Sequence, residues 1–327
     1  MEKLFKQASD LIKKSGKILI VSHRKPDADT LGAAISLKKW LDRSGKNITL
    51  ACCDKPGKVF SFLPDIDLFV KDFNLNDFDL MIVVDAGASY MTNFHLKYDN
   101  FLHPGIPIIN IDHHASNDHF GDINIVDLES ASVTVILFKM FEYLNVEIDQ
   151  DMATALLSGI YNDTGSFMHS NTTKEVFDIA SKWMDDGAKI AEISKALFNT
   201  KTISTLRLWG KVLEKAQVTD DNIAMSVLKD DEFDSAGAGP ENLTGVIDYL
   251  NMIPGTKFSV LVNEDRQGNV KGSFRTRRSN VDLSRIAAVF GGGGHPKASG
   301  FMIPGKLSEE VKYKIVDDDN DKKSLEF

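Results

Sequence analysis

The sequence contains little cysteine and no apolar run long enough to cross a membrane. Cys52 and Cys53 are the only cysteines in 327 residues, and as neighbours in a predicted strand they point to opposite faces. This arrangement is typical of core thiols in a reducing compartment, not of a disulfide framework or a metal site. No apolar run reaches the ~18 residues of a membrane span, and the amphipathic start, up to Lys14, is unlike a signal peptide. We therefore expect a cytoplasmic protein without a membrane partner.

The sequence also lacks an excess of positive charge. Its formal net charge of -9 and isoelectric point of about 5.4 argue against a protein that coats long nucleic acid. The net charge does not exclude short anionic substrates, because a local basic pocket can lie on an acidic chain. The composition, 43% hydrophobic and 26% charged, is that of a globular protein, and the length suffices for two domains.

The first part of the chain alternates short apolar runs with amphipathic segments. This alternation predicts an α/β fold with a mostly parallel sheet. The predicted strands are 17–21, 50–53, 66–70, 79–84, 108–111 and 123–126. The predicted helices are 2–15, one that carries Leu31 to Leu41 and ends at Gly45, 132–144, 151–161 and 172–186.

The remainder of the chain predicts a second, smaller α+β domain. Strands are expected at 223–228, 258–262 and 270–275, and helices at 240–253 and 282–290. We place the first domain at 1–187, a helical linker at 188–216, the second domain at 217–316 and a charged tail at 317–327.

Four segments that are distant in sequence place acidic residues, two of them with histidine, just past a predicted strand or helix. In open α/β sheets ligands bind outside the carboxyl ends of the strands, so these segments are expected to converge in one crevice. Oxygen and imidazole donors without thiolate favour Mn²⁺, Mg²⁺ or related ions. The donors are too many for one open catalytic ion but suffice for two ions that share a carboxylate, which predicts a two-metal hydrolase centre. The segments are His23 with Asp27 and Asp29, Asp85, Asp112 with His113 and His114, and Asp163.

Each motif alone has a simpler structural explanation. Asp29 could cap a helix, Asp85 could begin a turn, and Gly291 to Gly294 could form a flexible loop. Those explanations do not predict acidic residues at successive strand ends in this order, so the joint pattern favours the metal centre.

The motifs resemble those of the DHH phosphoesterase family. The resemblance rests on His-x-x-x-Asp-x-Asp at 23–29, Val-Val-Asp at 83–85, Asp-His-His at 112–114 and Asn-Asp-Thr-Gly at 162–165. Phe-Gly-Gly-Gly-Gly-His at 290–295, with Ser-Phe-Arg at 273–275 upstream, is similar to the DHH-associated C-terminal domain. The resemblance covers nearly the whole chain in the expected order.

The resemblance implies a role for each motif residue. One Mn²⁺ would be held by His23, Asp27 and Asp85, and a second by Asp29, Asp85, His113 and Asp163, with Mg²⁺ or Co²⁺ as alternatives. A hydroxide between the ions would attack phosphorus. Asp112 would orient His113, and His114 would contact the phosphate or protonate the leaving oxygen.

The second domain is expected to bind the substrate. Between Lys271 and Lys297 there are six basic residues and one acidic residue. Arginine suits bidentate phosphate contacts, and glycine backbone approaches an anion closely. We expect Arg275 and His295, with Gly293 and Gly294, to contact the substrate, whereas Arg277 and Arg278 are left open between substrate and solvent.

The family resemblance also implies the substrate class. We expect hydrolysis of short oligoribonucleotides (nanoRNA), of 3′-phosphoadenosine 5′-phosphate (pAp), or of both, and no long nucleic acid partner. The alternatives are cyclic di-AMP or its linear product, then polyphosphate or pyrophosphate. A non-catalytic nucleotide sensor is the alternative from a different class, and a homodimer is left open.

Overall fold

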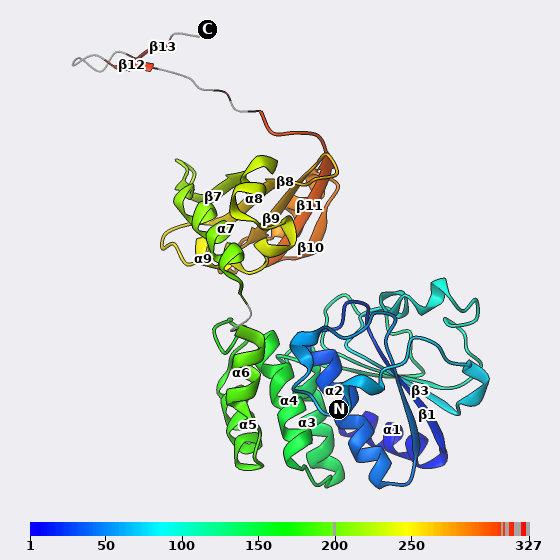
Figure 1. Cartoon of the computed structure of the whole chain (residues 1–327). Helices are drawn as coiled ribbons and strands as arrows, with labels where there is room; N and C mark the ends of the chain where they lie inside the picture. Colours follow the sequence, from blue (N-terminus) through cyan, green and yellow to red (C-terminus); the bar gives the residue numbers. More distant parts are fainter. Residues whose placement is uncertain (199–200, 309, 311–313, 317–321, 325–327) are drawn as a thin grey trace. The chain divides into compact units, whose positions relative to one another are not determined.

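The chain folds as two compact units (Figure 1). They are Met1–Thr200 and Lys201–Phe327. The segment 188–216, expected to be a linker, contributes helix α6 (Ile190–Phe198) to the first unit and helix α7 (Ile203–Glu214) to the second. The computed structural model describes residues 1–198, 201–308, 310, 314–316 and 322–324, so most of the predicted tail 317–327 lies outside the described residues.

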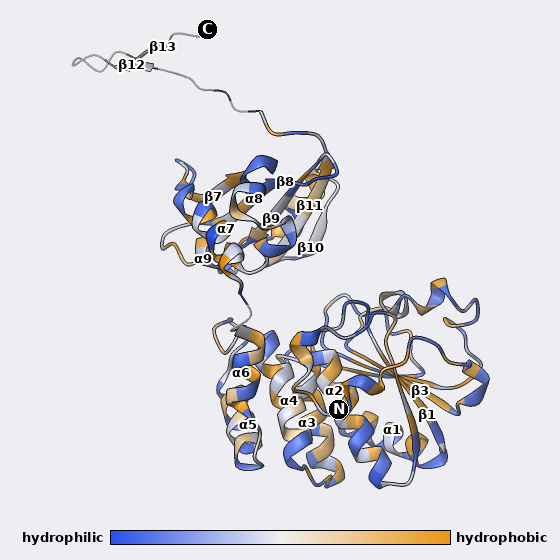
Figure 2. Ribbon diagram, viewed as in Figure 1, coloured by the Kyte–Doolittle hydropathy of each residue, from blue (hydrophilic) through white to orange (hydrophobic). Residues whose placement is uncertain are grey.

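The first unit is built on a five-stranded parallel sheet with the order β2-β1-β3-β4-β5. This confirms the predicted α/β class. The strands are rich in isoleucine, leucine and valine, and Figure 2 shows them in the orange of hydrophobic residues. Their bounds are β1 Lys17–Ser22, β2 Asn47–Ala51, β3 Leu80–Val84, β4 Ile108–Asp112 and β5 Ile123–Val126.

Both faces of this sheet are buried, which explains why its strands are apolar without alternation. Along β1, Ile18 and Ile20 pack in the larger core with the helices, whereas Leu19 and Val21 pack in a second core with Phe94 and other loop residues. The helices are α1 Glu2–Lys14, α2 Ala28–Arg43, α3 Val133–Leu144, α4 Gln150–Asp163, α5 Lys174–Asp185 and α6. The 3₁₀ turns are η1 Lys58–Phe60, η2 Ile66–Leu68, η3 Leu75–Asp77, η4 Ser89–Thr92 and η5 Phe94–Leu96.

The predicted strand at 66–70 was wrong. Asp65 adopts a left-handed conformation with φ 55°, and the chain then forms the η2 turn at Ile66–Leu68. Only Val70 reaches the sheet, through a single bridge to Ala51. The left-handed turn removes the extended backbone that pairing over several residues would need.

Helices α2 and α4 pack closely because each contributes a glycine to the contact. A Cβ at Gly32 of α2 would clash with the carbonyl oxygen of Ala155 in α4. A Cβ at Gly159 of α4 would lie 2.5 Å from a carboxylate oxygen of Asp29 in α2. The missing side chains thus let the start of α2 lie against the C-terminal half of α4.

The second unit contains a six-stranded mixed sheet with the order β10-β11-β9-β8-β7-β6. Helices α7 to α9 pack with Leu261 on one face, and α10 packs with Phe274 on the other. Its strands are β6 Gln217–Val218, β7 Ile223–Leu228, β8 Phe258–Glu264, β9 Asn269–Arg275, β10 Gly293–His295 and β11 Ala298–Pro304. Its other elements are α8 Asp230–Ala236, η6 Pro240–Leu243, α9 Val246–Leu250, α10 Leu283–Val289 and the separate pair β12 Lys314–Val316 and β13 Lys322–Ser324.

The helix predicted over 240–253 is divided in two. Gly245, with φ 97°, separates η6 from α9. Within the described part of the chain, no helix combines the length and the apolar character that crossing a membrane requires.

Gly32→Ala should destabilise the first unit by about 1–3 kcal/mol, because the added methyl group meets backbone that cannot rotate away. Urea-induced unfolding measures the loss. Gly57→Ala is the control, because a Cβ there would approach side-chain atoms no closer than 3.6 Å. Equal unfolding midpoints for the two variants would contradict the close α2–α4 contact.

Candidate metal centre

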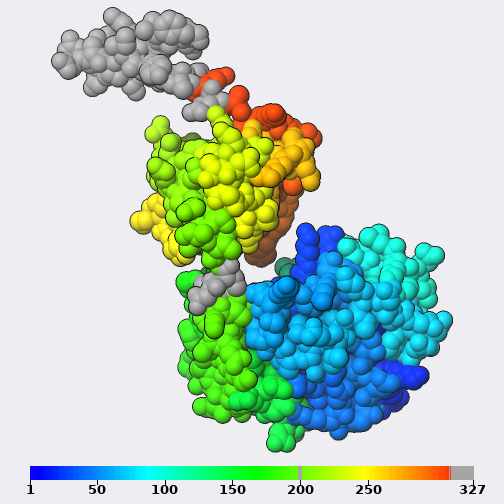
Figure 3. Space-filling view, viewed as in Figure 1, coloured from blue at the N-terminus to red at the C-terminus, as the bar shows by residue number. Residues whose placement is uncertain are grey.

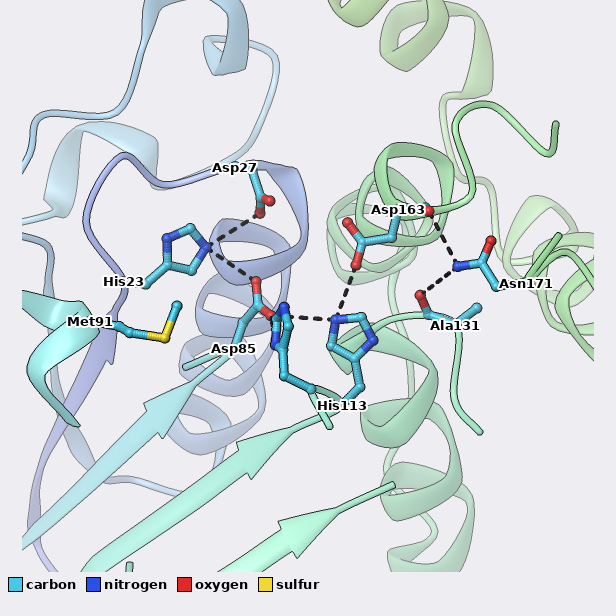
Figure 4. A pocket seen from close by; sticks show the side chains of 9 residues that line it. His23, Asp27, Asp85, Met91, His113, Ala131, Asp163 and Asn171 are labelled. Atoms are coloured by element: carbon cyan, nitrogen blue, oxygen red, sulfur yellow. Dashed lines mark hydrogen bonds and ion pairs between the residues drawn. The ribbon is translucent and has the colours of Figure 1, made fainter. Parts of the chain in front are cut away.

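The structure brings the four acidic segments of the first unit together (Figure 4). His23 follows β1, and Asp85 follows β3. Asp112 ends β4, and His113 and His114 come directly after it. Asp27 and Asp29 begin α2, and Asp163 ends α4. Most of these side chains line a cavity of about 350 Å³, together with Met91, Ala131 and Asn171.

Asp85 lies between two groups of donors. Its Oδ2 is 3.2 Å from Nε2 of His23, and its Oδ1 is 3.7 Å from Nε2 of His113. The side chain is nearly buried, yet Oδ1 accepts no hydrogen bond from the described residues. A buried carboxylate oxygen without a donor is costly, and a bound cation would satisfy it.

The backbone at Asp85 is also unusual. Its φ of 58° is left-handed, a conformation that aspartate and asparagine adopt more readily than most residues. The amide N–H of Asp85 still donates to the carbonyl oxygen of Ile111 in β4, at 2.9 Å. The turn directs the carboxylate away from the sheet and toward both donor groups.

His23 and His113 present an unprotonated nitrogen to carboxylates when their rings are neutral. Nδ1 of His23 lies 2.7 Å from the carbonyl oxygen of Arg24, and Nδ1 of His113 lies 3.3 Å from that of Ser130. These contacts place the ring proton on Nδ1 and leave Nε2 as an acceptor. Each Nε2 faces carboxylate oxygens. Because these atoms are all hydrogen-bond acceptors, a proton or a cation must lie between them.

Asp29 is fully buried between helices α2 and α3. Its Oδ2 accepts the amide hydrogen of Val133 at 2.7 Å, and its Oδ1 accepts that of Thr134 at 3.0 Å. Asp27 caps its own helix, because its carboxylate accepts the amides of Asp29 and Thr30. These capping bonds fix both carboxylates before any ligand binds.

The carboxylates perturb one another strongly. Burial, followed by the charges of Asp85 and Asp27, raises the pKa of Asp29 well above its usual value. Burial and the neighbouring carboxylates likewise raise the pKa of Asp163. Burial opposes the charged form of His23, but its interactions with Asp27 and Asp85 prevail and raise the pKa of His23 to about 11. In the absence of cations, these shifts favour the protonated forms of Asp29, Asp163 and His23, whereas the interactions with His23 lower the pKa of Asp27 despite its burial.

The geometry fits a centre for divalent cations. Donor atoms within 4.8 Å of one another form three groups. The donors are oxygen and imidazole nitrogen, and neither cysteine belongs to any of these groups among the described residues. The groups are His23, Asp27 and Asp85; Asp29, His113 and Asp163; and Asp85, His113 and His114.

Asp112 contacts a different histidine from the one expected. Its Oδ1 lies 2.8 Å from Nδ1 of His114, and its Oδ2 accepts a hydrogen bond from Asn117 at 2.7 Å. His113 is held by Ser130 instead, so the prediction that Asp112 orients His113 was wrong. The turn after β4 brings His114, two residues beyond Asp112, back over the carboxylate.

The expected substrate-binding residues lie in the second unit. Strand pairing joins His295 of β10 to Ala298 of β11, and Ala298 to Arg275 of β9. His295 and Arg275 therefore stand on the same face of the sheet, one strand apart. Arg275 Nε lies 3.5 Å from Asp248 Oδ1. A Cβ at Gly293 would meet no atom within 4 Å, whereas one at Gly294 would clash with Ser299 and the Ala298 carbonyl.

Sequence reasoning missed several residues that shape the centre. Asn171 lines the cavity and donates to the carbonyl oxygens of Ala131 and Asp163, both at 3.3 Å. Asn117 also donates to Asn110, which holds the turn after β3 through the Ala86 carbonyl oxygen. Isolated loop asparagines carry no pattern from which these contacts could have been predicted.

Comparison with known families matches both units. Residues 17–160 match the DHH family, N-terminal domain, and residues 220–319 match the DHHA1 domain. The DHH match contains three of the four motifs, and its end lies three residues before Asp163.

Two relatives share the name bifunctional oligoribonuclease and PAP phosphatase NrnA. The protein from Thermus thermophilus is 30% identical over 307 residues, which cover 92% of this chain and 89% of the relative. The protein from Bacillus subtilis is 26% identical over 291 residues, which cover 88% and 89%. The crystal structure of an exopolyphosphatase-related protein from Bacteroides fragilis superposes with a TM-score of 0.86 at 25% identity, covering 94% of this chain and 93% of the other.

Mn²⁺ or Mg²⁺ should raise the melting temperature of the protein, because cations relieve the repulsion among the carboxylates. At a free cation concentration 100 times Kd, binding stabilises the folded protein by about 2.7 kcal/mol. Asp85→Asn should lose most of this gain in differential scanning calorimetry while the metal-free protein stays folded, since asparagine tolerates the left-handed backbone. The exposed Asp99→Asn is the control and should keep the gain. A full metal response in Asp85→Asn would contradict a central role for Asp85.

Proposed function

The chain belongs to the DHH family, and on this premise we propose that it is a manganese-dependent phosphoesterase that hydrolyses short oligoribonucleotides, pAp, or both. The observation that carries this proposal is the position of Asp85 between two sets of carboxylate and imidazole donors. The names of the two relatives support the substrate class.

The proposal assigns the donors to two cations. His23, Asp27 and Asp85 would hold one, and Asp29, Asp85, His113 and Asp163 the other. The grouping of the donor atoms supports this division, and the unpartnered Oδ1 of Asp85 supports a shared carboxylate. The cations would offset the charge of the phosphate and acidify a water molecule.

His114 is proposed to act on the leaving oxygen. Its Nδ1 is engaged by Asp112, so Nε2 is the nitrogen available to a substrate. In the protein without cations, the hydrogen bond to Asp112 and the charges of Asp85 and Asp29 raise the pKa of His114 to about 9, which favours the protonated ring. A protonated imidazole can contact a phosphate oxygen or donate a proton as the ester bond breaks. Asp112 and Asn117 would fix the orientation of the ring.

The substrate contacts are proposed to come from Arg275 and His295. Their place on one face of the sheet lets both meet one phosphate group, and the open backbone at Gly293 admits an anion beside them. Arg278 is less suited to this role, because its guanidinium donates to the carbonyl oxygens of Thr256 and Gly255. Arg277 has no such partner among the described residues.

A Mn²⁺-supplemented assay should detect hydrolysis of 5′-phosphorylated RNA dimers to pentamers, of pAp, or of both. Linear and cyclic di-AMP, polyphosphate and pyrophosphate complete the panel, the last two because of the exopolyphosphatase-related structure. Asp85→Asn should lower turnover by at least about 100-fold, since even residues behind metal ligands contribute about 10–100-fold. Asp99→Asn should keep full activity.

Two results of the assay would reject the proposal. The first is the absence of phosphate or nucleotide release from all short ribonucleotides, and nucleotide binding without release would indicate a sensor. The second is normal turnover of Asp85→Asn, which would remove the shared carboxylate from the mechanism.

Arg275→Ala should raise KM roughly 10-fold or more with little change in kcat, because a hydrogen bond to a charged group contributes about 1.5–3 kcal/mol. Arg266→Ala is the matched control, since Arg266 lies in the turn between β8 and β9, at the opposite end of β9, and pairs with Asp234. A loss confined to kcat would instead assign Arg275 to transition-state stabilisation.

A further inference from the structure

Helix α7 carries apolar residues on two sides. One side, with Leu208 and Val212, is buried in the core of the second unit. The other side is exposed, and we call it the α7 stripe; it consists of Ile203, Leu206, Gly210 and Leu213. Ile203 is 66% exposed, Leu206 49% and Leu213 41%. Figure 3 shows yellow-green atoms of this part of the chain at the surface of the second unit. A contiguous apolar stripe on a helix indicates a contact with another helix.

Among the described residues of the second unit, no contact explains the glycine at position 210, in the middle of the stripe. Its φ is not positive, and a Cβ there would meet no atom within 4 Å. Glycine in an exposed helix interior is less favourable than alanine, so the position carries a local cost. The missing side chain does permit the close approach of another backbone.

Two opposite charges flank the stripe on one side. Arg207 precedes Gly210 by three residues and Glu214 follows it by four. The two residues therefore lie about two turns apart on the same side of the helix. The side chain of neither residue makes an ion pair or hydrogen bond with any residue that the structure describes. In two antiparallel α7 helices that cross at Gly210, Arg207 of each copy faces Glu214 of the other. In a parallel two-fold pair the charged residues of the two copies would lie on opposite sides of the contact and would not pair.

We propose that the α7 stripe binds the α7 stripe of a second copy of this chain, as an antiparallel homodimer about a two-fold axis at Gly210. The self-complementary charges favour a second copy over an unrelated partner, because a two-fold axis satisfies both pairs at once. The contact lies on α7 and uses no residue of the metal centre, so it is independent of the proposed function.

Sedimentation velocity of the full chain over a range of concentrations tests the dimer. The natural sequence should show a concentration-dependent dimer. Arg207→Glu and Glu214→Arg should each weaken dimerisation at least tenfold, because each places like charges together. The double variant R207E/E214R should restore the dimer, since it exchanges the charges. A natural chain that is monomeric throughout, or a double variant that stays monomeric, would overturn the proposal.

Two further variants separate the contact from effects on folding or net charge. Gly210→Leu should weaken dimerisation without lowering the melting temperature, because the site is open within the chain and leucine favours a helix. Arg285→Glu on α10, which packs on the opposite face of the sheet from α7, should leave the dimer unchanged. Unchanged dimerisation of Gly210→Leu, or dissociation of Arg285→Glu, would contradict the α7 contact.

Discussion

The repulsion among four aspartates in one cluster is the constraint on which the first unit depends. Two like charges roughly 4 Å apart repel by about 4 kcal/mol at an effective dielectric constant of about 20. Asp27, Asp29, Asp85 and Asp163 are nevertheless brought together by the start of helix α2, the end of strand β3 and the end of helix α4. The glycine contact between α2 and α4 supports this arrangement, because it lets the start of α2, with Asp29, lie close to the C-terminal half of α4, which ends at Asp163. The fold thus holds together a cluster of negative charges that only protons or cations can neutralise.

Much of the first unit could be predicted because its strands are short, apolar and buried on both faces. A run such as Ile108 to Ile111 has few other stable environments. The errors occurred where one residue changes the backbone direction. Asp65 converts an apolar run into a 3₁₀ turn, and Gly245 divides a predicted helix. Apolar periodicity does not detect such left-handed residues.

The candidate centre was predictable in composition but not in its internal contacts. The rule that parallel strands present their carboxyl ends at one edge was enough to gather His23, Asp85 and His113. It did not specify which histidine Asp112 would contact, because that choice depends on the turn after β4 and on Asn117. Contacts between neighbouring side chains in a turn follow from dihedral angles that residue types alone do not fix.

The same interactions that position the centre lower the stability of the protein when no cation is bound. Asp29 receives two amide hydrogen bonds from the start of α3, which favour its charged form, yet burial and its neighbours raise its pKa. Asp85 keeps a left-handed backbone and an unsatisfied oxygen. If the carboxylates could move apart, the centre would lose the geometry that suits cations. The rigidity that makes the cation-free cluster unfavourable would therefore also favour cation binding. The stability of the first unit and its affinity for cations are therefore expected to be coupled through the same carboxylates.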